Sequence, residues 1–407
     1  MLKFLARQKS TLSNQPVCTF QPCSPSFFGS EARQYRAWMT LVGTLIGLAV
    51  SHSAAQAASF SGLGFLPGDT SSSATGVSAD GSVVVGSSGN QAFRWTQSSG
   101  LAGLGFLPGG GSSSAAGVSA DGSVVVGESF APAIPIPPYY YSVLQAFRWT
   151  QAEGMRSLTV GSSASGVSAD GSVVVGTLYA PKFFSEALVW TSGIIQGLRT
   201  YPYLESSAHG VSADGSVVVG SARSFTSSIT EAFRWTQAAG LQVLGLLPGN
   251  SFSSASAVSA DGSVIVGQSG DEAFVWNSIQ GMQGLGFLPG NSFSSASAVS
   301  ADGSVIVGQS GGEAFVWSST QGMQSLTDVL IAAGVGNLTG WGLANAMAIS
   351  ADGYTVVGHG TNPGGQQEAW IADLRNTQPV PTPALLPGLI GMGLATWRRQ
   401  RQSSADS

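Results

Sequence analysis

The phrase Ser-Ala-Asp-Gly occurs seven times along the chain. Its aspartates, at intervals of 41, 49, 44, 47, 41 and 50 residues, are Asp80, Asp121, Asp170, Asp214, Asp261, Asp302 and Asp352. A period of roughly 40–50 residues is typical of solenoids, propellers and arrays, in which one unit cannot bury its apolar face alone. The repeat therefore predicts a modular architecture whose core is shared between neighbouring units.

Each repeat predicts four short β-strands. In the first copy, residues 74–86 contain two β-rich runs joined at Asp-Gly, a strong hairpin signal because such turns use positive φ values. The run at 91–96 follows, and a turn at 97–100 separates it from the run at 101–107. None of these runs carries a helical period. Four antiparallel strands per unit indicate a propeller blade.

The two ends of the array predict that it closes into a ring. A strand of the fourth type, residues 60–66, precedes the first hairpin, whereas the last strand of the third type, residues 368–374, has no successor. The N-terminal strand can complete the seventh unit and remove an exposed sheet edge. We therefore predict an all-β, seven-bladed β-propeller of four-stranded antiparallel blades, closed by the N-terminal strand. The first strand of each unit, rich in Ser, Ala and Gly, is expected at the crowded axis.

A second repeated block, Gln/Glu-Ala-Phe-x-Trp, resembles the HAF repeat, an extracellular repeat family named after His-Ala-Phe. The residues before Ala are Gln91, Gln145, Glu186, Glu231, Glu272, Glu313 and Glu368, so the family's His is absent throughout. Leu188 replaces Phe in the third copy, and Trp370 and Ala372 replace Phe and Trp in the seventh. The resemblance covers residues 60–374 and implies a surface-exposed β-propeller without established catalytic residues. We expect the repeated Phe and Trp to pack between blades.

Residues 1–57 resemble a secretory signal peptide with an extended n-region. Arg33 and Arg36 precede an apolar run at 38–50, and Ala55-Gln-Ala57 offers a cleavage site after Ala57. A run of about 13 residues is short for a membrane span and suits an h-region. The cysteines of the chain both fall inside the removed part: Cys18 and Cys23. We therefore expect a mature chain without thiols or disulfides.

Residues 377–407 resemble a linker followed by a PEP-CTERM sorting signal, in a variant known mainly from cyanobacteria. Its motif is Pro381, Thr382, Pro383 and Ala384, followed by an apolar segment and an arginine cluster. The cluster would hold the tail on the cytoplasmic side of a membrane. The resemblance implies transient membrane insertion of the C-terminal segment as a transmembrane helix, and processing by an exosortase-like protease. The protein, with its propeller at residues 58–376, is then expected to be secreted or at the cell surface.

Charge argues against a nucleic-acid-binding protein. Residues 58–378 contain eight Lys and Arg against nineteen Asp and Glu, hence a net charge of −11. Binding of nucleic acid requires a basic face that neutralises phosphates. The Ser and Gly content alone would suggest disorder, but 43% hydrophobic residues at a fixed period indicate a packed core.

No catalytic or metal-binding constellation stands out. His209 and His359 fall in different repeats, neither beside a repeated carboxylate. Each Asp-Gly turn offers a single Asp, whereas a calcium loop needs several oxygen ligands at close spacing. We therefore expect hairpin turns here, with no metal, no cofactor and no catalytic residues.

The connections that depart from the repeat are the best candidates for a binding surface. The connection between the second and third strands expands in three adjacent repeats, at residues 131–141, 179–184 and 222–230, and another unusual connection lies at 200–203. The aromatic residues proposed to form one contiguous, partly exposed patch are Tyr139, Tyr140, Tyr141, Phe183, Phe184, Tyr201 and Tyr203. They could stack on sugar rings, anchor a protein partner, or pack locally.

Two functions remain open. The first is a non-catalytic, exported interaction module that binds an extracellular polysaccharide or a matrix protein. The alternative is a polysaccharide-acting enzyme, a glycosidase or lyase, which would need two carboxylates about 5–10 Å apart beside a pocket. Carboxylates outside the repeated positions are few: Asp69, Glu128, Glu153, Glu205, Asp271, Asp328 and Asp373. Among them Glu128 and Glu205 flank the aromatic loops, which keeps the alternative open.

Overall fold

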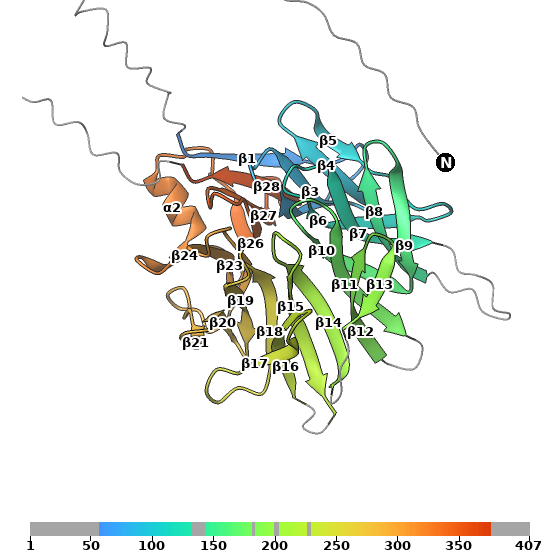
Figure 1. Ribbon diagram of the computed structural model, residues 1–407. Helices are drawn as coiled ribbons and strands as arrows, with labels where there is room; N and C mark the ends of the chain where they lie inside the picture. The colour runs from blue at the N-terminus through green and yellow to red at the C-terminus, as the bar shows by residue number, and fades with distance from the viewer. Residues whose placement is uncertain (1–56, 132–142, 181–183, 199–202, 226–228, 376–407) are drawn as a thin grey trace, which may run out of the picture. The chain divides into compact units, whose positions relative to one another are not determined.

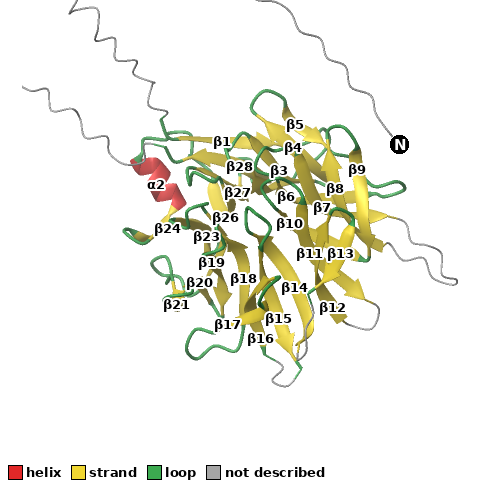
Figure 2. Ribbon diagram, in the orientation of Figure 1, coloured by secondary structure: helices red, strands yellow, loops and turns green. Residues whose placement is uncertain are grey.

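The computed structural model describes residues 57–131, 143–180, 184–198, 203–225 and 229–375. These residues form seven four-stranded antiparallel sheets, the blades of a β-propeller (Figure 1). Strands make up nearly all of the regular structure (Figure 2). The predicted seven-bladed propeller is thus confirmed. The predicted signal peptide before Ala57 and the predicted sorting motif lie outside the described residues.

Each blade has four strands, called a to d from the axis outward. The a strands are β2 (Ser72–Val77), β6 (Ser112–Val118), β10 (Ser162–Val167), β14 (Tyr203–Val211), β18 (Ser253–Val258), β22 (Ser294–Val299) and β26 (Gly342–Ile349). The b strands are β3 (Val83–Ser88), β7 (Val124–Ala131), β11 (Val173–Ala180), β15 (Val217–Ser224), β19 (Val264–Ser269), β23 (Val305–Ser310) and β27 (Thr355–Thr361). The c strands are β4 (Gln91–Thr96), β8 (Val143–Thr150), β12 (Phe184–Thr191), β16 (Thr230–Thr236), β20 (Glu272–Asn277), β24 (Glu313–Ser318) and β28 (Gln367–Asp373). The d strands are β5 (Gly100–Gly103), β9 (Gly154–Val160), β13 (Ile194–Gly197), β17 (Gly240–Gly245), β21 (Gly281–Gly284), β25 (Gly322–Ser325) and, for blade 7, β1 (Ser59–Gly64).

The N-terminal strand closes the ring. β1 pairs antiparallel with β28, with Ser59 opposite Asp373 and Gly64 opposite Ala369. The blue N-terminal strand therefore lies beside the red C-terminal one in Figure 1. Because β1 completes the sheet of β26, β27 and β28, the d position of blade 7 is filled. The closure predicted from the one-strand offset between the two ends is confirmed.

A cycle of backbone hydrogen bonds closes the ring a second time. The alanine of each Ser-Ala-Asp-Gly phrase donates its N–H to the carbonyl of the equivalent alanine in the next blade. The N–H of Ala79 bonds to the carbonyl of Ala120 at 3.0 Å, and the series returns when Ala351 donates to Ala79 at 3.0 Å. We call this the alanine cycle; its members are Ala79, Ala120, Ala169, Ala213, Ala260, Ala301 and Ala351. Hence the seam between blades 7 and 1 carries the same bond as the other six seams.

The Ser-Ala-Asp-Gly phrase forms the predicted a–b hairpin, but its turn differs from the expected one. A two-residue type I′ turn needs positive φ at both central residues. Here Gly81 has φ +77°, whereas Asp80 is not in the positive-φ region. Instead, the N–H of Gly81 bonds to the carbonyl of Ser78 at 3.0 Å, and Oδ1 of Asp80 accepts the Ser78 hydroxyl at 2.7 Å. The aspartate side chain therefore stabilises the turn from within.

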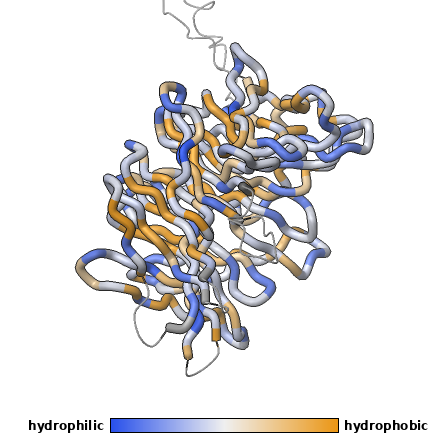
Figure 3. Tube along the Cα trace, turned by 90° about the vertical axis from the view of Figure 1, so that its right-hand side faces the viewer, coloured by the Kyte–Doolittle hydropathy of each residue, from blue (hydrophilic) through white to orange (hydrophobic). Residues whose placement is uncertain are grey.

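The valines of strand b pack on both faces of each sheet. Val83 and Val85 lie in a buried cluster with Phe147 of blade 2, whereas Val84 lies in a cluster with Val357 of blade 7. Burial of both faces explains why the apolar residues of strand b, such as residues 83–85, do not alternate with polar ones. Hydrophobic stretches of the chain trace recur through the domain in Figure 3. The repeated Phe is fully buried between blades, as Phe93 and Phe147 show, which confirms the predicted packing role.

Buried serines join neighbouring blades. The Ser113 hydroxyl accepts the N–H of Ala92 from the preceding blade at 3.0 Å and donates to the carbonyl of Gly105 at 2.7 Å. Ser72 makes the same two bonds across the closing seam, to the Ala369 N–H at 2.9 Å and the Gly64 carbonyl at 2.7 Å. Buried polar groups are tolerated when they are hydrogen-bonded. The high serine content is thus part of the packed structure.

Two elements differ from the sequence-based expectation. The strand expected at residues 101–107 ends at Gly103, because Gly105 adopts φ +78° and turns the chain toward the next blade. The helix α2 (Leu326–Ala332) interrupts the d–a connection after blade 6, where no helix was expected. Ser325 caps its first turn by accepting the Asp328 N–H at 3.3 Å. Within the described residues, no helix is long and apolar enough to cross a membrane.

Candidate binding surface

Up-and-down topology gives each blade two ends with different connections. The b–c and d–a connections emerge together at one end, called the loop face, and the a–b and c–d turns at the other, called the turn face. All expanded connections found in the sequence belong to the loop face. The rigid blades thus present the variable segments on one side, as in many binding proteins.

The sequence-predicted aromatic residues are only partly covered by the described residues. Phe184 begins β12, opposite Ala180 of β11, and Tyr203 begins β14, opposite Ser224 of β15. Both backbone positions lie at the loop face. The remaining residues of the predicted set lie outside the described residues: Tyr139, Tyr140, Tyr141, Phe183 and Tyr201. The contiguous aromatic patch therefore stays a prediction.

The bases of the three expanded b–c connections carry exposed aromatic side chains. Phe130 in β7, Tyr179 in β11 and Phe225 just after β15 are 41%, 51% and 67% exposed. In blades with short connections, the position equivalent to Phe130 and Tyr179 is occupied by a glycine with positive φ, such as Gly89 or Gly270. Replacing this turning glycine lets strand b continue toward the loop face. That replacement was the sequence signal for Phe130, which our candidate set omitted.

Further exposed aromatics lie in the d–a connections of the same face. Phe106, Phe252 and Phe287 are each about two-fifths exposed. We call the six residues the aromatic rim: Phe106, Phe130, Tyr179, Phe225, Phe252 and Phe287. Exposed apolar side chains of the turn face include Ile194, Ile279 and Tyr354. The rim therefore concentrates aromatic rings on the loop face, although exposed apolar groups also occur elsewhere.

The residue that follows the repeated glycine of strand b varies more than its neighbours do. These positions, near the loop-face end of strand b, are Ser87, Glu128, Thr177, Ser221, Gln268, Gln309 and His359. Burial raises the pKa of the Glu128 carboxyl and lowers that of the His359 imidazole. His359 also reaches across the closing seam, with Nδ1 3.2 Å from the Ser73 hydroxyl of blade 1. Polar variability thus occurs near the same end of the blades as the aromatic rim.

His209 and His359 lie in different blades and do not contact each other. His209, in strand a of blade 4, donates Nδ1–H to the carbonyl of Ala255 in blade 5 at 2.8 Å. Burial lowers its pKa. Among the described residues, no group of three or more His, Cys, Asp or Glu could hold a metal ion.

The repeated Glu or Gln before Ala-Phe has a structural partner in strand d. Oε1 of Glu272 accepts the Gly286 N–H at 2.9 Å, and Oε1 of Glu368 accepts the Gly64 N–H at 2.8 Å. The side chain needs a glycine opposite: a Cβ on Gly284 would overlap the Glu272 carboxylate. The position at which the resembling family has His therefore fastens strand c to strand d in this chain.

The turn aspartates are likewise held by their own turns. The hydroxyl of the preceding serine, together with the N–H and hydroxyl of the following serine, lowers the pKa of Asp121, Asp170 and Asp261 to about 2. In the Asp261 turn all three bonds go to Oδ1. The carboxylates are therefore ionised at neutral pH, with the second oxygen directed away from these bonds.

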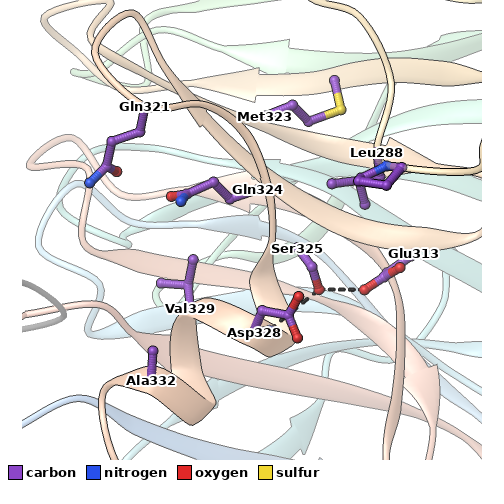
Figure 4. Close-up of a pocket in the computed structure, with 10 residues that line it drawn as sticks. Leu288, Glu313, Gln321, Met323, Gln324, Ser325, Asp328, Val329 and Ala332 are labelled. Atoms are coloured by element: carbon purple, nitrogen blue, oxygen red, sulfur yellow. Dashed lines mark hydrogen bonds between the residues drawn. The ribbon is translucent and has the colours of Figure 1, made fainter.

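The cavity drawn in Figure 4 lies between blade 6 and α2 and has a volume of about 590 Å³. Leu288, Met323 and Val329 give it apolar walls, and Ser325 bonds to the Glu313 carboxylate at one side. An equivalent cavity of about 530 Å³ lies one blade earlier, along Pro248, Glu272 and Met282. The cavity is thus a feature of the repeat to which α2 adds a wall.

The chain matches no known family model and no curated protein sequence. Solved structures similar to it include TolB from Acinetobacter baumannii, with a TM-score of 0.39 and 13% identity over 64% of this chain and 62% of TolB. The chain therefore spans less than two thirds of the length of that relative. Oligogalacturonate lyase from Vibrio parahaemolyticus gives a TM-score of 0.48 and 10% identity, covering 78% of this chain and 94% of the lyase. The Dos1 propeller gives a TM-score of 0.43 and 10% identity, covering 79% of this chain and 95% of the Dos1 chain. At these identities the likenesses concern the fold alone.

Proposed function

We propose that the protein is an exported, non-catalytic β-propeller that acts as an interaction module at the cell surface or in the extracellular matrix. Its loop face binds an extracellular polysaccharide. The observation that carries this proposal is the exposure of Phe130, Tyr179 and Phe225 at the bases of three adjacent expanded connections. Blades 5 and 6 lack both the expansion and the aromatic residue at this position, so the scaffold does not require them.

Aromatic rings on a rigid rim suit a polysaccharide ligand. The apolar faces of pyranose rings stack on aromatic side chains, while polar groups nearby bond the hydroxyls. The rim supplies the rings, and Ser87, Glu128 and Gln268 supply polar groups near the same end of strand b. Prolines at 132, 135, 137 and 138 in the longest connection lower the entropy cost of an ordered binding loop.

Export and processing are part of the proposal and rest on the two ends of the sequence. We expect cleavage after Ala57 and removal or attachment of the tail near the Pro381–Ala384 motif by an exosortase-like protease. Intact-mass spectrometry of the protein from its native source should then find neither Cys18 nor Arg399. Recovery of a full-length chain from the cytoplasm would contradict export.

Glu128 supports the alternative function, a glycosidase or lyase. Its pKa is raised by burial, the property that lets a carboxyl act as a general acid in glycoside hydrolysis. A second acidic group of the loop face, Glu205, forms an ion pair with Arg223 at 3.5 Å. A glycosidase or lyase on this scaffold would use Glu128 as its acid.

A glycan array combined with a reducing-sugar release assay on the full chain separates the two functions. An interaction module binds one or more glycans and releases no sugar over hours. Release of reducing ends that disappears in Glu128→Gln would instead establish the enzyme. Binding of matrix proteins with no binding to any glycan would replace the polysaccharide with a protein partner.

A further inference from the structure

The turn face carries grooves at two seams between blades, and in each an arginine of strand c faces the a–b turn and the tryptophan of the next blade. Between blades 4 and 5, a groove of about 590 Å³ has one wall formed by Arg234 and Gln242, and the other by Asp261, Ser263 and Trp276. Between blades 2 and 3, a groove of about 450 Å³ places Arg148 opposite Ser172 and Trp190. We call these two sites the arginine grooves. Their volumes fall in the usual range of small-ligand pockets, about 300–1,000 Å³.

The fold positions both walls closely. Gly262 has φ +74°, and a Cβ at this position would overlap Val217 of the preceding blade. The glycine therefore lets the Asp261 turn sit tightly against blade 4, at the edge of the groove. In the seam between blades 1 and 2, Arg94 donates Nε–H to the Gly122 carbonyl at 3.2 Å, which shows that this arginine position reaches the next blade's turn.

In the arginine grooves the two arginine side chains and one carboxylate oxygen lack partners, whereas the Trp190 indole N–H donates to the Thr159 hydroxyl at 2.9 Å. The side chains of Arg148 and Arg234 form no hydrogen bond or ion pair with any residue that the structure describes. In the Asp261 turn the three side-chain and backbone donors all bond Oδ1, which leaves Oδ2 as a free acceptor. A planar donor and an ionised acceptor thus line one groove without pairing with each other.

Trp276 completes the groove between blades 4 and 5. Its indole is half-buried against the core of the seam, and its N–H makes no bond to any described residue. An apolar ring face beside one planar donor and one acceptor matches a pyranose, whose C–H face is apolar and whose adjacent hydroxyls both donate and accept. The Asp261 carboxylate at the same wall would repel a polyanion.

We propose that the arginine grooves are binding subsites for neutral hexopyranose units of a polysaccharide. This inference rests on the proposed function for the class of ligand, but its residues belong to the opposite face of the propeller. Two subsites on one rigid ring allow a single polymer to bind at both, so that affinity for a polysaccharide exceeds affinity for a monosaccharide.

The sequence itself offers the substitution that tests this proposal. The position of Arg148 and Arg234 is valine in blades 5 and 6, at Val275 and Val316, so the double variant Arg148→Val/Arg234→Val is compatible with the fold. Arg94→Val in β4 is the matched control, because this arginine holds the same strand position in blade 1 but lies outside both arginine grooves, with Nε–H bonded to the Gly122 carbonyl. Arg234→Lys, which keeps the charge but loses the planar fork, is a second groove variant.

Affinity electrophoresis of the full chain in gels with dextran, galactomannan or alginate provides the measurement. We expect at least one neutral polymer to retard the parent and Arg94→Val equally. The double groove variant should lose tenfold or more in affinity and Arg234→Lys a smaller part, with unchanged melting temperatures. The proposal is overturned if no neutral polymer retards the parent, if the groove variants bind like the parent, or if alginate alone binds.

A loop-face variant separates this inference from the proposed function. Phe130→Ser/Phe225→Ser changes the aromatic rim and leaves both arginine grooves intact. If the loop-face variant loses binding and the groove variants bind like the parent, the grooves are refuted as polysaccharide subsites and the loop face is supported as the binding site. Loss in the groove variants alone would refute the loop face as the polysaccharide site and support the grooves.

Discussion

The structural role of Asp80 and its counterparts is set by the residues beside them in the turn. The sequence offers seven aspartates at equal positions, which invites comparison with a ring of ligands. Each turn, however, gives its carboxylate one backbone N–H and one or two hydroxyl donors, as for Asp80 with the Ser78 hydroxyl and the N–H and hydroxyl of Ser82. The turn was predictable from Asp-Gly, but its type was not, because the serine side chains decide it.

The turn aspartates predict acid sensitivity. The folded pKa is lowered for Asp80, Asp214 and Asp302, and is lowered to about 2 for Asp121, Asp170 and Asp261, below the ordinary value of about 3.9. A group with a lowered folded pKa stabilises the fold above its unfolded pKa and loses this contribution as the pH falls through the folded pKa. Urea unfolding should therefore show a midpoint that falls between pH 4 and pH 2. A midpoint that is constant over this range would contradict the assignment.

The glycine of strand b predicts a second effect of a single residue. A Cβ on Gly267 would overlap the carbonyl oxygen of Ser254 in strand a. Gly267→Ala should therefore lower the free energy of unfolding by about 3 kcal/mol, because backbone atoms must move apart. Gly111→Ala is the control, since a Cβ there meets open space. Equal stability of the two variants in urea titrations would show that strand b does not approach strand a as closely as described.

At the scale of elements, the repeated parts of the fold were predictable and the exceptions were not. The Asp-Gly hairpins and the Phe-x-Trp strands follow from turn chemistry and from burial of both sheet faces. The helix α2 was missed because its single buried pair, Leu326 and Leu330, is too short to form a helical period. Phe130 was missed because its signal, the replacement of the turning glycine of strand b, has a meaning only once Gly89 and Gly270 are known to adopt positive φ. The sequence thus located the loop face, but not the described residues that define its rim.

The helix α2 gives a prediction at this scale. Leu330 is fully buried, whereas its neighbour Ile331 is 57% exposed. Leu330→Ala should cost about 2–5 kcal/mol of stability through the cavity it leaves. Ile331→Ala should change stability by less than about 0.5 kcal/mol. Thermal unfolding of the two variants checks this, and similar losses in both would contradict the packing of α2 into the core between blades 6 and 7.

At the scale of the whole molecule, closure makes the two ends of the domain interdependent. At the seam between blades 7 and 1, Ser72 makes the same two bonds as the buried serines of other seams. The Ala351–Ala79 hydrogen bond there is the counterpart of the alanine bonds at the other seams. Its strand β1 comes from the N-terminus, so the ring forms only when both ends have been made. The offset count in the sequence predicted this pairing, whereas the alanine cycle emerged from the structure alone.

Deletion of residues 58–67 tests the closure. It removes β1, exposes the edge of β28, and uncovers apolar residues such as Trp370. Lost burial and an unpaired edge should together lower stability by several kcal/mol and promote association between chains. Denaturant titration and light scattering measure the two effects. A deletion variant as stable and as monomeric as the parent would contradict closure by β1.

Retention of the full chain on polysaccharide extracted from the matrix of its native source tests the proposed function most directly. The comparison is between the parent and Tyr139→Ala/Tyr140→Ala/Tyr141→Ala, with melting temperatures measured on the same samples. We predict weaker retention of the triple variant at a nearly unchanged melting temperature. Retention equal to that of the parent, or unfolding of the variant, would show that these aromatic residues are not a binding surface.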